Sequence, residues 1–169
     1  AEEKKSGTME LLLTRPISDL QIVTAKYFAS LVLVIIALLP TLVFFATVYY
    51  LGNPPGNVDV GGTIGSYIGL FFLAAIYAAI GIFSSSLTNN QIIAFIIAVI
   101  ISFIFYMGFE FLSSMWIFSS VDAFIVDLGI NAHYESMSRG VIDTRDVIYF
   151  LSVIVVFIYL TKTVIQNRK

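Results

Sequence analysis

The chain has 169 residues, of which 59% are hydrophobic and only 12% are charged, whereas soluble domains of this size usually carry about a quarter of their residues charged. A mean hydropathy of +0.94 excludes an ordinary soluble fold, because one core could not enclose so much apolar surface. The net charge of −2 offers no basic field for nucleic acid, and the lack of cysteine excludes disulfides and thiol catalysis. We expect an all-α, polytopic integral membrane protein.

The segment before the first apolar run carries two helix signals. Leucine-rich residues 8–14 predict a short helix that an arginine–proline pair ends. After that pair, Ser18 and Gln21 have the spacing of a capping box, in which the serine side chain accepts from the Gln21 amide and the glutamine side chain reaches back. We expect residues 1–26 to form a cytoplasmic segment that leads into a membrane helix.

Four apolar runs are long enough to cross a bilayer, whose core of about 30 Å needs about 20 helical residues. They lie at residues 27–51, 66–86, 92–109 and 147–165. Pro40 lies inside the first run and predicts a bend near Leu39, because proline removes a backbone hydrogen bond that neighbouring helices must replace. The membrane domain is therefore expected at residues 27–165, with four spans.

Lysine and arginine predict the orientation of these spans. Seven of the nine positive residues fall on the side of the two termini, and only Arg139 and Arg145 fall on the other side. Because positive residues in short loops stay in the cytoplasm, we expect both ends of the chain there, with residues 166–169 as a cytoplasmic tail. The chain starts without methionine and shows no signal peptide, and we expect that it begins within a longer protein.

Residues 111–146 form an external connection that is too long for a plain linker. Apolar residues recur in it at spacings of three and four, which predicts one apolar helix face: Ile117, Val121, Phe124, Ile125 and Leu128. Two interpretations stay open. We favour an interfacial or re-entrant helix over a soluble cap helix that packs on its own loop.

Few residues could carry chemistry. The sequence has no phosphate-binding Walker loop and no GxGxxG, GxSxG or HExxH pattern, so we expect no catalysis, cofactor or metal in this chain. Glu110 ends the third apolar run, and we favour an interfacial carboxylate in water or near Arg139 or Arg145 over an ion site. We interpret His133, the single histidine, as an ordinary residue of an external loop.

The second apolar run carries small residues at helical spacing, which allow helix backbones to approach closely. The stripe includes Gly65, Gly69, Ala75 and Ala79. We favour packing within the chain over a dimer interface.

Residues 2–19, with the sequence EEKKSGTMELLLTRPISD, resemble the cytoplasmic segment of type-2 ABC transporter permeases, the ABC-2 family. Residues 138–152 resemble the stretch that leads into the last helix of the gliding-motility-associated permease subunit of Bacteroidetes. The resemblance covers nearly the whole chain. It implies a six-helix permease of a bacterial inner membrane, of which this chain lacks the first two helices.

The resemblance also implies the partners and the sites. It predicts an ATP-driven exporter with a separate ABC ATP-binding subunit, a second permease chain and membrane lipid as partners. The coupling residues that it implies are Glu3, Lys4, Lys5, Gly7, Glu10, Arg15, Pro16, Ser18 and Asp19. The candidate site residues of the external re-entrant region are Glu110, Trp116, Arg139 and Asp143. The alternative function is a membrane anchor of a motility or surface machinery that transports nothing.

Overall fold

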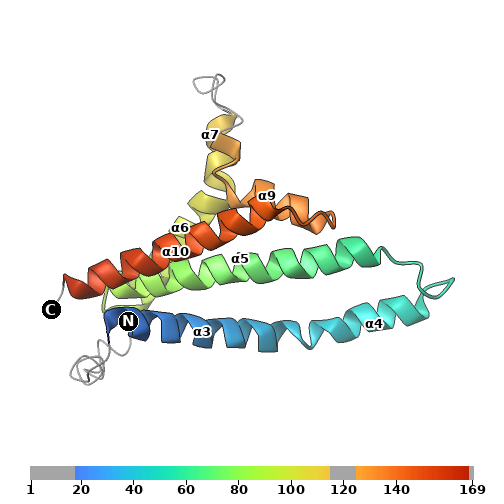
Figure 1. Ribbon diagram of the computed structural model, residues 1–169, viewed down its shortest axis with the longest axis horizontal. Coiled ribbons are helices and arrows are strands. Elements are labelled where there is room, and N and C mark those ends of the chain that lie inside the picture. Colours follow the sequence, from blue (N-terminus) through green and yellow to red (C-terminus); the bar gives the residue numbers. More distant parts are fainter. Residues whose placement is uncertain (1–17, 115–124, 168–169) are drawn as a thin grey trace.

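The computed structural model describes residues 18–114 and 125–167. In these residues every regular element is helical, and four helices are long and apolar enough to cross a membrane. They span Asp19–Leu51, Val60–Leu87, Gln91–Ser113 and Thr144–Gln166. The all-α, four-helix membrane fold is confirmed (Figure 1).

The first span consists of α3 (Asp19–Leu38) and α4 (Thr41–Leu51). The capping box is present, because the Ser18 amide donates to Gln21 Oε1 at 2.9 Å and the Gln21 amide donates to Ser18 Oγ at 3.3 Å. Leu39 and Pro40 separate the two helices, as the proline predicted. α4 buries no residue against the rest of the chain.

The second span is α5 (Val60–Leu87). It begins before the apolar run does, because the Asp59 side chain caps it by accepting from the Gly62 amide at 2.9 Å. Asn90 caps the next helix in the same way, accepting from the amides of Ile92 and Ile93. Side-chain caps of this kind satisfy amides that a helix start leaves without a partner.

The third span is one rod built from α6 (Gln91–Phe103), the π-helical turn η1 (Ile104–Gly108) and α7 (Phe109–Ser113). In Figure 1 this rod rises away from α3, α5 and α10, which run along the long axis. A π-helical turn inside an α-helix adds a residue to one turn and often marks a functional position.

The connection to the last span contains α9 (Ile130–Ser138), and α10 (Thr144–Gln166) follows. Asp143 caps α10 by accepting from the Arg145 amide at 3.0 Å. The amphipathic face predicted in residues 111–146 falls mostly in 115–124, outside the described residues. Its membrane placement therefore stays a prediction.

α5 lies at the centre of the packing, between α3, α10, α6 and α9. Ile76 and Ile80 of α5 and Phe150 of α10 are fully buried. Aromatic rings join the helices: Phe150 lies 5.5 Å from the ring of Phe72, and Phe157 lies 5.4 Å from that of Phe105.

The start of α3 and the end of α10 lie side by side, because Ile22, Val23 and Ile165 form one buried cluster. We call this the Ser18 end of the bundle, and the end where α10 begins the Asp146 end. Large apolar side chains point outward between them, including Leu33, Phe44 and Phe95 at 68%, 71% and 69% exposure. Such surface is compatible with lipid tails, which are as apolar as leucine.

Candidate functional site

The predicted coupling residues lie mostly before the described part of the chain. Ser18 and Asp19 are the two that the structure describes, and the other seven lie in residues 1–17, outside the described residues. Ser18 caps α3, and Asp19 in its first turn is buried at 8% exposure. A carboxylate there interacts favourably with the positive end of the helix dipole.

The first turns of α3 are held tightly on the bundle. Val23 is 1% exposed, and Ile22 and Ile165 are 7% and 8% exposed. Ile82 of α5 and Ile158 of α10 pack against this cluster. The start of α3 is therefore packed against both α5 and α10.

At the Asp146 end, α9 docks on α5 at the two predicted glycines. A Cβ on Gly65 would lie 2.4 Å from the main-chain oxygen of Met137, and a Cβ on Gly69 would lie 3.1 Å from Met137 Cβ. Ser66 Oγ donates to the Ser138 carbonyl at 3.1 Å. The close approach therefore depends on the missing side chains of Gly65 and Gly69.

The two predicted alanines of the stripe lie deeper in α5. Ala75 is 2% exposed and Ala79 is 1% exposed, and both belong to the main buried cluster with Phe150. The four small residues thus pack within the chain in this structure.

The residues predicted for the external region do not form one group. Glu110 is exposed, and its Oε2 accepts from Asn131 Nδ2 at 3.0 Å. Arg139 forms an ion pair with Glu135 one turn earlier in α9. Asp143 is the cap of α10, and Trp116 lies outside the described residues.

The interpretation of His133 as an ordinary loop residue is wrong. It lies in α9, and its side chain is 15% exposed. Its Nδ1 lies 2.7 Å from Asp146 Oδ1, and its Nε2 lies 2.9 Å from the main-chain oxygen of Asp127. The ring stacks on Tyr149 with a centroid distance of 4.0 Å. Sequence reasoning missed this cluster because its members come from different elements and share no motif.

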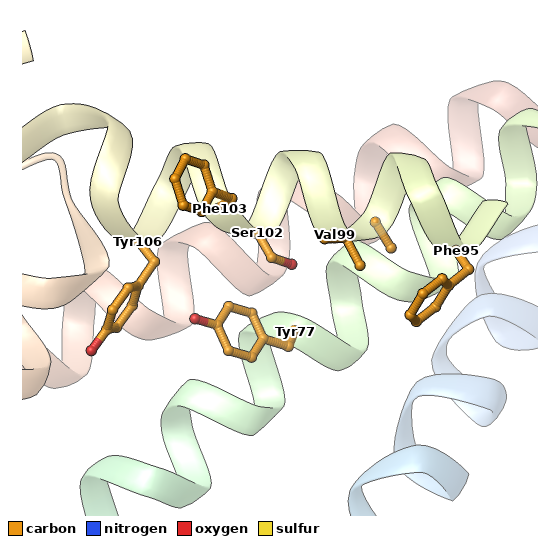
Figure 2. Close-up of a pocket in the computed structure, with 7 residues that line it drawn as sticks. Tyr77, Phe95, Val99, Ser102, Phe103 and Tyr106 are labelled. Carbon is orange, nitrogen blue, oxygen red and sulfur yellow. The ribbon is translucent and has the colours of Figure 1, made fainter. Parts of the chain in front are cut away.

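A shallow, open groove with a volume of about 410 Å³ lies between α5 and the α6–η1 rod. Figure 2 shows Tyr77 of α5 projecting toward the rod, opposite Ser102 and Tyr106. Apolar side chains complete the lining: Phe95, Ala98, Val99 and Phe103. The accessible surface of this groove is almost entirely apolar, and such a surface suits an aliphatic or aromatic group. No sequence signal pointed to these residues, because they face one another only across two helices.

Comparison with known families decides what this assembly of helices is. The family model described as ABC-2 family transporter protein matches residues 1–169. The chain belongs to the ABC-2 transporter family. No curated protein and no solved structure matches it.

Membership agrees with the absence of a nucleotide-binding motif from these 169 residues. This ABC-2 protein is a multi-pass membrane component, and its family generally works with an ATP-binding subunit. The family match supports no link to gliding motility. In this ABC-2 protein, the packed start of α3 directly follows the segment that resembles a coupling region.

Proposed function

We propose that this ABC-2 permease receives force from an ATP-binding subunit through residues 3–19 and passes it to the helix bundle at the start of α3. The observation that carries the proposal is the packing of Ile22 and Val23 against Ile165. A capped helix start that is buried on two neighbouring helices moves as a unit with them, because a packed core deforms little.

In this mechanism two permease chains pair with two ATP-binding subunits in the bacterial inner membrane. The subunits approach each other when ATP binds, and this displaces residues 3–19 on the cytoplasmic side. α3 then tilts against α5 and α10. ATP binding thus biases a membrane dimer between two arrangements, which is a two-state mechanism driven by differential affinity.

The break at Leu39 and Pro40 supports the same view. It separates the packed helix α3 from α4, which buries no residue. Interruptions of this kind absorb the change in backbone angles when one part of a helix moves. α3 therefore has a place at which it can tilt without carrying α4 with it.

The assignment to gliding motility rests on the likeness of residues 138–152 to the permease subunit of Bacteroidetes. If both termini are cytoplasmic, as the distribution of lysine and arginine predicts, the cargo of such an exporter would leave on the Asp146 side of the bundle. A membrane anchor of the same machinery would show no ATPase activity that depends on a cargo, whereas a transporter reconstituted with its ATP-binding subunit would.

The lack of native cysteine makes a direct test simple. A single cysteine at Glu10 or Arg15 should cross-link to a cysteine on the co-expressed ATP-binding subunit. The matched control is a cysteine at Asn57, which is exposed in the loop between α4 and α5 at the other end. No cross-link from any position between residues 3 and 19 would contradict the proposal.

A further inference from the structure

The cluster of His133, Asp146 and Tyr149, which we call the His133 clasp, joins α9 to the first turns of α10. Besides the two contacts of the imidazole, Tyr149 Oη donates to the Leu128 carbonyl at 2.7 Å. The clasp therefore holds both α9 and the segment before it. At 1.5 Å rise per residue, Asp146 lies roughly 28 Å along α10 from Ile165, so the clasp is remote from the Ser18 end.

Above the pH range in which histidine ordinarily titrates, the hydrogen bonds of His133 require one proton more than a separated neutral imidazole and a separated carboxylate hold. The carbonyl oxygen of Asp127 only accepts, so Nε2 must carry a hydrogen to bond it at 2.9 Å. A neutral imidazole with hydrogen on Nε2 has a bare lone pair on Nδ1. An ionised carboxylate also only accepts, so a lone pair and Asp146 Oδ1 at 2.7 Å would repel each other.

A proton between Nδ1 and Oδ1 removes this conflict, whether it resides on the imidazole or on the carboxyl group. Asp146 is 6% exposed, and its Oδ2 is buried without a hydrogen-bond partner in the described structure. Without the shared proton, Asp146 Oδ1 would face the lone pair of Nδ1, and Oδ2 would still have no hydrogen-bond partner in the described structure. The closed clasp consequently binds a proton that the open clasp releases.

Several of the neighbouring charged groups have partners of their own. On the elements around α9, Glu110 bonds Asn131, Glu135 pairs with Arg139, and Asp143 caps α10. The remaining ionisable side chains of these elements, outside the clasp itself, are Tyr67, Tyr77, Tyr106, Asp127, Tyr134, Arg145, Tyr159 and Lys162.

We infer that the His133 clasp is a protonation-sensitive latch, which holds α9 on α10 when the pair shares a proton and releases α9 as the pH rises. The sign follows from the extra proton of the closed state, because raising the pH favours whichever state binds fewer protons. Histidine is the side chain whose charge ordinarily changes between about pH 5 and pH 8. The latch thus sets how firmly the helix beside Gly65 and Gly69 is docked.

The test is the distance between spin labels on α9 and α10 in the full chain, at about pH 5 and about pH 9, on either side of the range in which histidine titrates. Cysteines at Glu135 and Ile148 carry the labels, because both side chains are exposed. We expect one short distance at the lower pH and a second, longer distance at the higher pH. A reference pair at Asn89 and Asn167, near the Ser18 end, should not change.

The variant Asp146→Asn separates the latch from a general effect of pH. An asparagine amide can donate to the bare Nδ1 of neutral His133, so the variant should keep the short distance at both values. Three results would overturn the proposal: an unchanged distance in the unmodified pair, the same change in Asp146→Asn, or an equal change in the reference pair. The first of these does not depend on the folding of Asp146→Asn.

Discussion

The backbones of Gly65 and Gly140 are in contact, so that a Cβ on Gly65 would lie 2.6 Å from Gly140 Cα. The neighbouring atoms are backbone, which cannot rotate away as a flexible side chain could. Gly65→Ala should therefore push α9 off α5 and lower the free energy of unfolding by about 1–3 kcal/mol, the usual cost of overpacking. Equilibrium unfolding of the purified chain in mixed micelles measures this difference in the free energy of unfolding.

Gly81 supplies the matched control on the same helix. A Cβ there would meet no atom within 4 Å. Because alanine favours a helix over glycine by about 1 kcal/mol, Gly81→Ala should leave stability unchanged or raise it. Equal losses for the two variants would show that the contact with Gly140 contributes nothing.

Ser18 tests the capped start of α3. Ser18→Ala removes the acceptor of the Gln21 amide and should cost about 0.5–2 kcal/mol, as the loss of an N-cap usually does. Hydrogen exchange at the amides of the first turn should become faster. Ser18→Thr keeps a hydroxyl acceptor and should leave exchange nearly unchanged, whereas equal exchange in all three proteins would mean that the cap does not hold this turn.

Tyr149 tests the attachment of the segment before α9. Tyr149→Phe keeps the ring on His133 but removes the bond from Oη to the Leu128 carbonyl. We expect the free energy of unfolding to fall by about 0.5–1.5 kcal/mol, the net contribution of one hydrogen bond. The melting temperature in detergent should fall accordingly. The control Tyr50→Phe alters a side chain that is 74% exposed and should melt like the parent; a parental melting temperature for Tyr149→Phe would count against this bond.

Pro40 tests the division of the first span. With alanine in its place, the amide of residue 40 can donate to the Ile36 carbonyl, and α3 and α4 should join into one helix. Spin labels on cysteines at Ala29 and Ala46, both exposed, should then show a narrower distance distribution. Pro55→Ala in the following loop should not narrow it, and equal widths for all three proteins would show that Leu39 and Pro40 are no hinge.

Features that depend on neighbouring residues could be predicted from the sequence. The capping box of Ser18 and Gln21 and the break at Pro40 arise from local backbone chemistry, and the four spans arise from the length of apolar runs. The apolar runs did not predict where α5 and α10 begin. Asp59 and Asp143 cap first turns that lie outside the apolar segments, so both helices start earlier than the runs do.

Contacts between elements could not be predicted in the same way. His133 and Asp146 are separated by 13 positions, and nothing in their spacing shows that α9 folds back on α10. The π-helical turn η1 lies inside an apolar run, where periodicity alone does not distinguish it from α-helix. The membrane placement of residues 111–146 and the coupling role of residues 2–19 stay predictions.

We expect the bundle to cross the membrane with its Ser18 end in the cytoplasm. Labelling of single cysteines in intact cells with a membrane-impermeant maleimide measures this orientation. Asn57→Cys, between α4 and α5, should react from outside, and Asn89→Cys, between α5 and α6, should react only after the membrane is opened. Labelling of Asn89→Cys in intact cells, with Asn57→Cys protected, would contradict this orientation. Equal labelling of both would contradict the prediction that α5 crosses the membrane between the two loops.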